Sequence, residues 1–328
     1  MTKPYVYVTR RVPEEALTPL RDFAEIHMWP EEEVPVSREE LIKQAKKADA
    51  LYTMLSDKVD AELMREAPNL KVVANLAVGY DNIDVNEATK RNIAVCNTPD
   101  VLSDTTADLT FALLMATGRR IVESAEYIKK GYWKNWGPLL LAGTDIHHKT
   151  IGIVGMGRIG TAVAKRATGF DMEILYHNRS RKEDVEKQLG ATYASFDQLI
   201  EMSDYIVCLA PLTEETRDLF TEDVFKRMKS SAIFINASRG AVVDEEALEK
   251  AIVEKEIAGA GLDVFREEPI GEDHALLKHD NVVALPHIGS SSVETRYEMA
   301  KLVSRNIVHV LQGKEPEAIV NQEVIYKE

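Results

Sequence analysis

The stretch Thr150-Ile-Gly-Ile-Val-Gly-Met-Gly-Arg-Ile-Gly160 decides the fold of this chain. An apolar run typical of a buried β-strand ends in a Gly-x-Gly-x-x-Gly turn and passes directly into a helical pattern over 161–167. Gly155 permits the tight turn, Gly157 lets a pyrophosphate approach the backbone, and Gly160 lets the helix pack close to the strand. This context favours a dinucleotide-binding unit over an ordinary glycine turn, with the phosphates at the helix N-terminus. The contacts expected from the turn are Gly155, Met156, Gly157, Arg158, Ile159 and Gly160.

The loop after the next β-like run, 172–176, indicates which dinucleotide is preferred. Sites for NAD usually carry Asp or Glu about 20 residues past the glycines, where the carboxylate binds the ribose 2′-OH. Here the chain reads His177-Asn-Arg-Ser-Arg181, with no acid. Because guanidinium groups pair with phosphate, we expect NADP(H) as the preferred cofactor, with NAD(H) possible and a solvated basic loop as the other interpretation. The predicted contacts are Asn178, Arg179, Ser180 and Arg181.

Length and charge restrict the classes of protein to consider. The 328 residues suggest two domains, and a formal net charge of −14 disfavours nucleic acid and anionic membranes as partners. Cys96 and Cys208 lie in apolar runs and are expected to be buried thiols in a reducing compartment. Since no signal peptide or membrane-length apolar run is visible in the sequence, we expect a cytoplasmic protein.

Apolar β-like runs alternate with helical patterns, which predicts doubly wound α/β sheets. Six runs lie between residues 151 and 285, and four earlier ones, at 5–9, 50–55, 70–74 and 93–96, predict a smaller α/β domain. The residues after 288 are too few for a domain of their own, so we expect them to complete the smaller one. The prediction is a Rossmann-type dinucleotide domain, 100–288, and a discontinuous, flavodoxin-like substrate domain, 1–99 and 289–328. The segment 104–121 is predicted to be one long helix.

Reduction of a carbonyl by hydride transfer needs a cation to hold the substrate and a proton donor that works near neutral pH. Three segments offer such side chains: Asn236-Ala-Ser-Arg239-Gly, Gly261-Leu-Asp-Val-Phe-Arg-Glu-Glu268-Pro and Pro286-His287-Ile-Gly289. Each follows the carboxyl end of a predicted strand, where open α/β sheets bind ligands, so their polar side chains can converge. Taken singly, they could equally be a surface arginine, a solvated carboxylate and a capping histidine.

In these motifs, taken in order, the chain resembles the D-isomer-specific 2-hydroxyacid dehydrogenases over its whole length. Trp136-x-Pro138…Gly143 and the basic loop 178–181 resemble the glyoxylate/hydroxypyruvate reductase branch. The resemblance implies NADPH-dependent reduction of small anionic 2-keto acids to 2-hydroxy acids. Among these substrates it favours glyoxylate and hydroxypyruvate.

The resemblance also implies roles for individual residues. His287 is the general acid of reduction, and Glu268 hydrogen-bonds the other ring nitrogen, orients the imidazole and favours its protonated form. Arg239 binds the substrate carboxylate and polarises the keto oxygen, while the backbone N–H groups of Val78 and Gly79 hold the carboxylate. The remaining cofactor contacts that it implies are Thr106, Leu209, Pro211, Ala237, Ser238, Asp263 and Gly289, of which Asp263 would meet the nicotinamide carboxamide.

Two other functions stay open. One is an NAD-dependent D-lactate or D-3-phosphoglycerate dehydrogenase, and the other is a dinucleotide-sensing, corepressor-like scaffold with the same fold. The apolar loop 131–145 suggests either a subunit contact or packing on its own chain, and the family suggests a homodimer. No metal site is predicted, because His147 and His148 have no nearby cysteine or HExxH partner.

Overall fold

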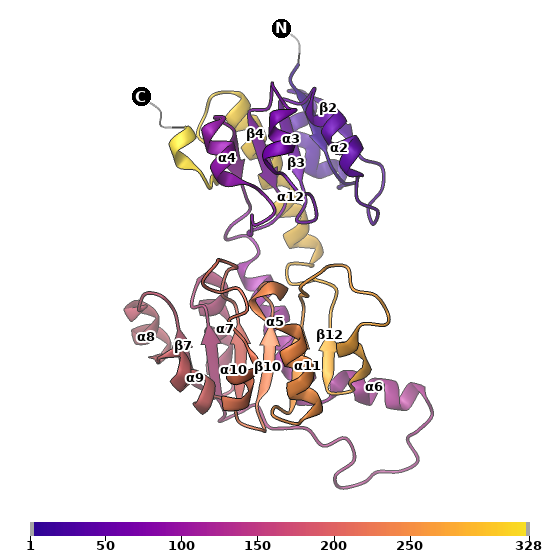
Figure 1. The fold of residues 1–328 in the computed structure, drawn as a ribbon, viewed down its shortest axis with the longest axis vertical. Coiled ribbons are helices and arrows are strands. Elements are labelled where there is room, and N and C mark those ends of the chain that lie inside the picture. The colour runs from indigo at the N-terminus through magenta and orange to yellow at the C-terminus, as the bar shows by residue number, and fades with distance from the viewer. Residues whose placement is uncertain (1–2, 326–328) are drawn as a thin grey trace. The chain divides into compact units, whose positions relative to one another are not determined.

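The computed structural model describes residues 3–325, which form two compact units. Unit 1 combines the chain up to Leu102 with the chain from Ser292 onward, and unit 2 is Ser103–Ser291. Each unit is built around one parallel sheet (Figure 1). Within residues 3–325 no helix is long and apolar enough to cross a membrane.

Unit 1 has a five-stranded sheet with the order β2-β1-β3-β4-β5, and every pair is parallel. The strands are β1 (Tyr5–Val8), β2 (Glu25–Met28), β3 (Ala50–Thr53), β4 (Val72–Asn75) and β5 (Ala94–Cys96). The helices are α1 (Thr18–Arg21), α2 (Arg38–Ala45), α3 (Ala61–Arg65), α4 (Val85–Lys90) and α12 (Val293–Leu311), with 3-10 turns η1 (Glu14–Leu17) and η4 (Gln322–Val324).

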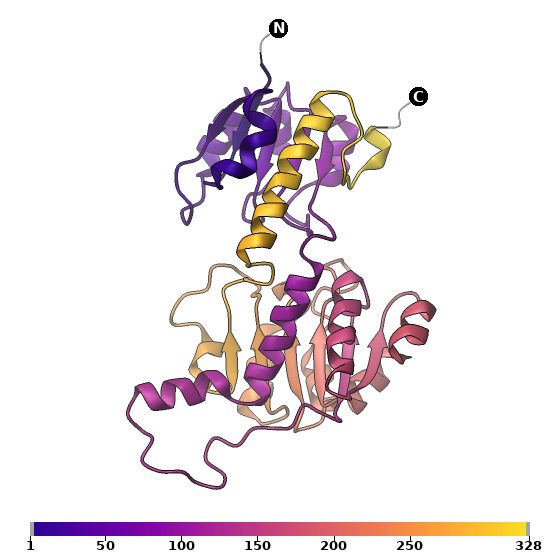
Figure 2. The same cartoon turned by 180° about the vertical axis from the view of Figure 1, so that it is seen from behind.

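Both faces of the unit 1 sheet are covered, so every residue of the inner strands β3 and β4 is buried and most are apolar. Val6 and Val8 of β1 pack in the cluster that includes residues of α1 and α12. Tyr7, pointing to the opposite face, packs in the cluster formed with α2, α3 and α4. Figure 2 shows α12 lying along one face of this sheet, so the C-terminal helix completes a core that the N-terminal strands begin.

Unit 2 has a seven-stranded parallel sheet with the order β12-β11-β10-β9-β6-β7-β8. The strands are β6 (Thr150–Val154), β7 (Glu173–His177), β8 (Thr192–Tyr193), β9 (Tyr205–Cys208), β10 (Ile233–Asn236), β11 (Gly259–Leu262) and β12 (Val282–Ala284). The helices are α5 (Ser103–Gly118), α6 (Ile121–Lys129), α7 (Arg158–Thr168), α8 (Glu183–Leu189), α9 (Phe196–Met202), α10 (Glu222–Arg227) and α11 (Glu245–Val253), with 3-10 turns η2 (Gly240–Val242) and η3 (Ala275–Lys278).

The strand order of unit 2 reverses at β6. The chain runs outward from β6 through β7 to β8, then returns to β9 on the other side of β6 and continues to β12. This is the doubly wound arrangement in which a ligand crevice opens outside the carboxyl ends of the two strands at the reversal. Helices α5 and α7 pack on one face of the sheet, and α9, α10 and α11 pack on the other. The predicted α/β, Rossmann-type fold is confirmed.

Two sequence expectations about this fold were wrong in detail. The predicted helix 104–121 ends at Gly118, because Arg120 adopts a left-handed conformation with φ of 51° and a separate helix, α6, starts at Ile121. The strands β2 and β8 were not predicted. Both lie at sheet edges, where β2 alternates exposed and half-buried residues and β8 has only two residues, so neither carries a continuous apolar run.

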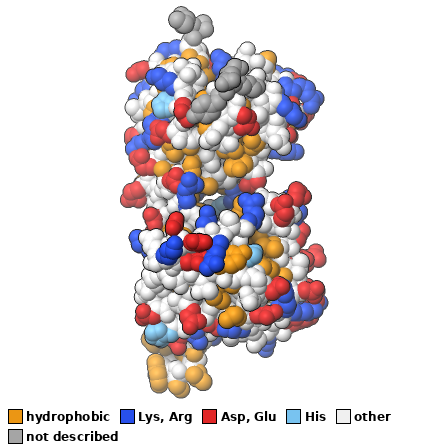
Figure 3. Space-filling model, turned by 90° about the vertical axis from the view of Figure 1, so that its left-hand side faces the viewer, with side chains coloured by type: hydrophobic (Ala, Val, Ile, Leu, Met, Phe, Trp, Pro, Cys, Tyr) orange, Lys and Arg blue, Asp and Glu red, His pale blue; other side chains and the backbone are white. Residues whose placement is uncertain are grey.

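Helix α6 and the loop that follows it expose apolar side chains. No residue of α6 is buried, and Trp136 and Leu139 in the loop are 77% and 81% exposed. Apolar side chains mark the projecting segment at the lower end of the view in Figure 3. The side chains of Trp136 and Leu139 therefore make little contact with their own unit, whereas Thr144 in the same loop is hydrogen-bonded to Tyr205.

Candidate active site

The glycine turn after β6 has the geometry that a pyrophosphate site requires. Gly155 has φ of +103°, and a Cβ there would lie 2.6 Å from the backbone nitrogen of Ala210, so the turn lies against the end of β9 at the reversal point. A Cβ at Gly160 would collide with the carbonyl oxygen of Gly155, whereas a Cβ at Gly157 would meet nothing within 4 Å. The first and third glycines are therefore needed for the close approach of neighbouring backbone, and the second leaves space for a ligand beside the backbone.

The N-terminus of α7 adjoins that space. The helix begins at Arg158 after Gly157, and no side chain caps it. Backbone N–H groups and the positive end of the helix dipole are therefore presented to an anion. Among the predicted contacts from the turn, Met156 differs from its neighbours, because its side chain is 1% exposed and packs in the core. Only its backbone can face a ligand.

Three of the predicted cofactor contacts, Thr106, Asp263 and Gly289, lie together. Gly289 is so placed that a Cβ would lie 3.1 Å from an Asp263 carboxylate oxygen and 3.3 Å from the Thr106 methyl group. Thr106 Oγ1 is buried and has no hydrogen-bond partner within the described part of the chain. A buried hydroxyl without a partner is costly, so this atom fits a site completed by a polar ligand. The other predicted contacts lie at the same sheet edge: Leu209 and Pro211 follow β9, and Ala237 and Ser238 follow β10.

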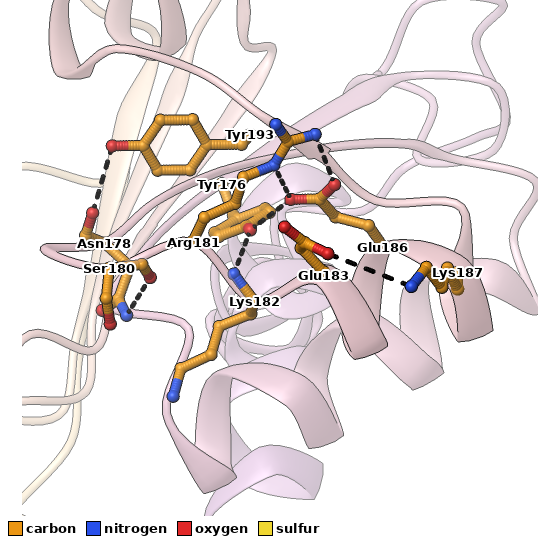
Figure 4. A network of polar contacts seen from close by, with 9 residues as sticks. All are labelled: Tyr176, Asn178, Ser180, Arg181, Lys182, Glu183, Glu186, Lys187 and Tyr193. Carbon is orange, nitrogen blue, oxygen red and sulfur yellow. Dashed lines mark hydrogen bonds and ion pairs between the residues drawn. The ribbon is translucent and has the colours of Figure 1, made fainter.

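The basic loop after β7 is held by a polar network (Figure 4). Arg181 binds Glu186 of α8 through two hydrogen bonds, both 2.8 Å long. Tyr176 donates to the same carboxylate at 2.7 Å and accepts a hydrogen bond from the Lys182 N–H at 2.7 Å. Hydrogen bonds from Arg181 and Tyr176 lower the pKa of Glu186 to about 2. Glu186 was not predicted as a partner of this loop, because an acid in the first turn of α8 could equally face solvent.

This network distinguishes the two arginines of the loop. Two N–H groups of Arg181 donate hydrogen bonds to Glu186. Arg179 instead contributes to lowering the pKa of Glu215, on another loop. The pKa of Glu215 is lowered first by the Thr213 hydroxyl, then by a backbone N–H, and also by the charge of Arg179. Glu215 lies on the loop after β9, the strand next to β6 at the reversal of the strand order. The structure therefore anchors Arg181 on α8, and the charge of Arg179 acts on a carboxylate of the loop after β9.

Glu268 and His287 form a hydrogen-bonded pair. Glu268 Oε2 lies 2.7 Å from His287 Nδ1, and Glu268 Oε1 accepts the Phe265 N–H at 2.9 Å. Burial works to raise the pKa of Glu268, but the hydrogen bond and charge of His287, the Phe265 N–H and the charge of Arg239 together lower it. The carboxylate is thus ionised near neutral pH, and His287 Nε2 remains as the ring atom available for proton transfer.

The backbone of the histidine loop is fixed by a buried carboxylate. His287 has φ of 54°, an unusual conformation for a residue with a side chain. Asp263, 1% exposed, accepts the Ile288 N–H at 2.8 Å and also the Gly289 N–H. Burial raises the pKa of Asp263, although these hydrogen bonds oppose the rise. Asp263 therefore holds the turn that presents the imidazole.

Gly240 brings the arginine loop against the loop that carries Glu268. A Cβ at Gly240 would overlap the Phe265 carbonyl group and the Arg266 nitrogen. Asn236 fixes the same loop, because its side chain donates to the Arg239 carbonyl at 3.1 Å and accepts the Ser238 N–H at 3.0 Å. Sequence reasoning missed these two positioning roles, since the packing of two loops leaves no periodic pattern.

In unit 1, Val78 and Gly79 lie in the loop after β4, at the carboxyl edge of that sheet. Asn97 donates to the Val78 carbonyl at 2.8 Å, and Asn75 donates to the Gly79 carbonyl at 3.0 Å. The carbonyl groups of this loop are thus held by buried side chains.

The side chains near the predicted site supply a cation, a proton donor and a cradle for a cofactor. Within residues 3–325, no group of three or more His, Cys, Asp or Glu side chains could hold a metal ion. Arg239 supplies a cation, the Glu268–His287 pair supplies a proton donor, and the glycine turn with Thr106 fits a dinucleotide. This set can bind an anionic carbonyl compound and protonate its oxygen.

The comparisons with known proteins agree with this chemistry. The family described as "D-isomer specific 2-hydroxyacid dehydrogenase, NAD binding domain" matches residues 111–289. A glyoxylate reductase of Pyrococcus horikoshii is 52% identical over 328 residues, covering 98% of this chain and 97% of that protein. A glyoxylate reductase of Korarchaeum cryptofilum is 51% identical over 324 residues, with 98% and 97% covered.

A solved structure has the same fold over the whole chain. The NADPH-dependent glyoxylate/hydroxypyruvate reductase of Sinorhizobium meliloti, in complex with NADP and malonate, is 32% identical. It superposes with a TM-score of 0.87 and covers 100% of this chain and 99% of its own.

Proposed function

Because the chain belongs to the D-isomer-specific 2-hydroxyacid dehydrogenases, in the glyoxylate reductase branch, we propose that it reduces glyoxylate and hydroxypyruvate to the corresponding 2-hydroxy acids with NADPH. The hydrogen-bonded Glu268–His287 pair beside Arg239 supports this most directly, since it supplies the proton donor and the cation that a 2-keto acid needs. The glyoxylate reductases that match nearly the whole chain support the substrate class.

The proposed mechanism divides the work among this chain's residues. A nicotinamide cofactor, when bound, would supply the hydride that reduces the carbonyl carbon. Arg239 binds the substrate carboxylate and polarises the carbonyl oxygen through its planar fork. His287 Nε2 gives its proton to that oxygen, which becomes the hydroxyl group of the product. Glu268 orients the ring through Nδ1 and balances the positive charge that it carries before the transfer.

The glycine turn, Thr106 and the basic loop would hold the cofactor. The N–H groups at the start of α7 would bind the pyrophosphate, and Thr106 would use its unpartnered hydroxyl on the cofactor. We assign the NADP(H) preference to the loop 178–181, chiefly to Arg179, because Arg181 is already paired with Glu186. The NADP complex of the Sinorhizobium reductase is consistent with this assignment.

Steady-state kinetics test the proposal. The values of kcat/KM should be measured with NADPH and NADH against glyoxylate, hydroxypyruvate and pyruvate. We expect NADPH with glyoxylate or hydroxypyruvate to be the best combination. A clear preference for NADH would refute the assignment of the basic loop, and no turnover of any 2-keto acid would refute the proposed function.

We also propose that the chain forms a homodimer through the apolar segment of α6 and its following loop. Soluble monomers rarely expose contiguous apolar surface of this kind, and Trp136 and Leu139 are mostly exposed. Light scattering should show a dimer for the wild type and a smaller mass for a Trp136→Ser, Leu139→Ser variant. Val34→Ser is the control, because Val34 is also exposed, at 56%, but lies in unit 1. An unchanged mass in the double variant would contradict the assignment.

A further inference from the structure

The turn 264–268, which lies after β11, carries Glu268, so its shape decides where that carboxylate meets His287. Glu268 Oε1 accepts the Phe265 N–H at 2.9 Å, which leaves Oε2 for His287 Nδ1 at 2.7 Å. One oxygen of the carboxylate thus attaches it to the turn, and the other holds the imidazole. Any shift of the turn therefore moves the oxygen that holds the ring.

The next N–H group along the turn is bound by a carboxylate from another segment. The Arg266 N–H donates to Oε1 of Glu245, the first residue of α11, at 2.5 Å. Asp244 already caps this helix, since its side chain accepts the Ala247 N–H at 3.2 Å. The Glu245 carboxylate is therefore not used to cap its own helix and instead holds the turn.

The second oxygen of Glu245 also faces the turn. Glu245 Oε2 lies 3.5 Å from His274 Nε2, and the His274 ring packs edge-on against the Phe265 ring, with 5.5 Å between the ring centroids. The Glu245 side chain is only 18% exposed, and Phe265 is buried. Because water and salt screen buried charges less than exposed ones, this carboxylate restrains the turn more strongly than a surface ion pair would.

The Arg266 side chain makes a second attachment of the same turn. Arg266 Nη2 donates to the Val243 carbonyl at 2.7 Å and also to Asp218. Asp218 is itself tied to the same segment, because its N–H donates to the Ala241 carbonyl at 3.0 Å. The side chains of Arg266 and Asp218 are 38% and 44% exposed, so water weakens their ion pair. The bond from Glu245 is thus the better shielded of the two attachments.

We propose that Glu245 is a positioning residue for the Glu268–His287 pair. By accepting the Arg266 N–H, it holds the turn in the shape that directs Glu268 Oε2 at the imidazole, an inference that rests on the function proposed above. All these residues lie in unit 2. A residue that acts through the proton donor in this way affects the reduction step and not the binding of NADPH.

The kinetic test compares two replacements of Glu245. Glu245→Ala removes the acceptor for the Arg266 N–H, whereas Glu245→Gln keeps a carbonyl oxygen and loses only the charge. We expect the single-turnover rate of glyoxylate reduction to fall about tenfold in Glu245→Ala and to stay within about threefold of the wild type in Glu245→Gln. NADPH affinity, measured by fluorescence, should not change in either variant.

Glu246→Ala is the matched control. Glu246 is the next residue of α11, is exposed, and is likewise an acid in the first turn of the helix. Both alanine variants therefore lose the same favourable interaction with the helix dipole, but only Glu245→Ala loses the bond to the Arg266 N–H. The control should keep the wild-type rate. An equal loss of rate in the control, or in Glu245→Gln, would overturn the positioning role.

A measurement without substrate separates this proposal from the proposed function. In protein that contains isotope-labelled histidine, the NMR signal of the His287 Cε1–Hε1 group is assigned by its loss in His287→Ala. At one fixed pH we expect this signal to move in Glu245→Ala and to keep its wild-type position in Glu246→Ala. An unmoved His287 signal in Glu245→Ala would overturn the positioning role whatever the rates. If the signal moves but the wild type reduces no 2-keto acid, the proposed function alone is overturned.

Discussion

Replacing Glu268 with Gln should slow the reduction of glyoxylate. The Glu268 carboxylate lies 2.7 Å from His287 Nδ1, where it orients the ring and balances the positive charge that the ring carries before proton transfer. A hydrogen bond to a charged group is worth about 1.5–3 kcal/mol. Because the two side chains are 35% and 29% exposed and water screens them, we take the lower end, about 1.5 kcal/mol, or about tenfold in kcat/KM.

The assay is kcat/KM for glyoxylate at one fixed pH, with saturating NADPH. The value for Glu268→Gln should be about tenfold below that of the wild type. Glu267→Gln is the control, since it removes an exposed charge from the adjacent residue. An unchanged kcat/KM in Glu268→Gln, or an equal loss in the control, would refute the reasoning.

The other substitutions test the cofactor loop, the substrate cation and the packing of the loops. Arg179→Asp should lower kcat/KM for NADPH by roughly tenfold to a hundredfold and shift preference toward NADH; equal losses with both cofactors would contradict phosphate recognition. Arg239→Lys keeps the charge but loses the planar fork, so it should raise the KM for glyoxylate while NADPH affinity, measured by fluorescence, stays the same. Gly240→Val should overlap Phe265 and lower the free energy of unfolding in urea by about 1–3 kcal/mol. Gly169→Ala should not, because its added carbon meets the nearest atom at 3.4 Å.

The parts of the fold with a periodic or glycine-based pattern could be predicted from the sequence. The β6–α7 unit followed from Gly155, Gly157 and Gly160, whose roles depend on local backbone geometry. The edge strands β2 and β8 could not be predicted, because an exposed edge needs no apolar run. The break at Arg120 was also missed, although Gly118 stands two residues before it, because an isolated glycine inside a helical pattern does not by itself predict a helix end.

The residues of the candidate site also differ in whether the sequence could predict them. Arg239, Glu268 and His287 could be proposed because each follows a strand whose carboxyl end lies at one edge of the sheet. The pairing of Arg181 with Glu186 could not, since both residues are charged and either could face solvent. The carbonyls held by Asn75 and Asn97 depend on two loops meeting in space, which the order of residues does not specify.

Single-turnover reduction of glyoxylate by His287→Ala tests the central claim most directly. Wild type and variant should be mixed with NADPH and glyoxylate, and the loss of NADPH absorbance followed in time. NADPH affinity, measured separately by fluorescence, should be unchanged, because the imidazole serves the carbonyl and not the phosphates. We predict a rate lower by roughly 10²–10⁴, the usual contribution of a positioned proton donor. A variant that reduces glyoxylate at the wild-type rate would contradict the mechanism.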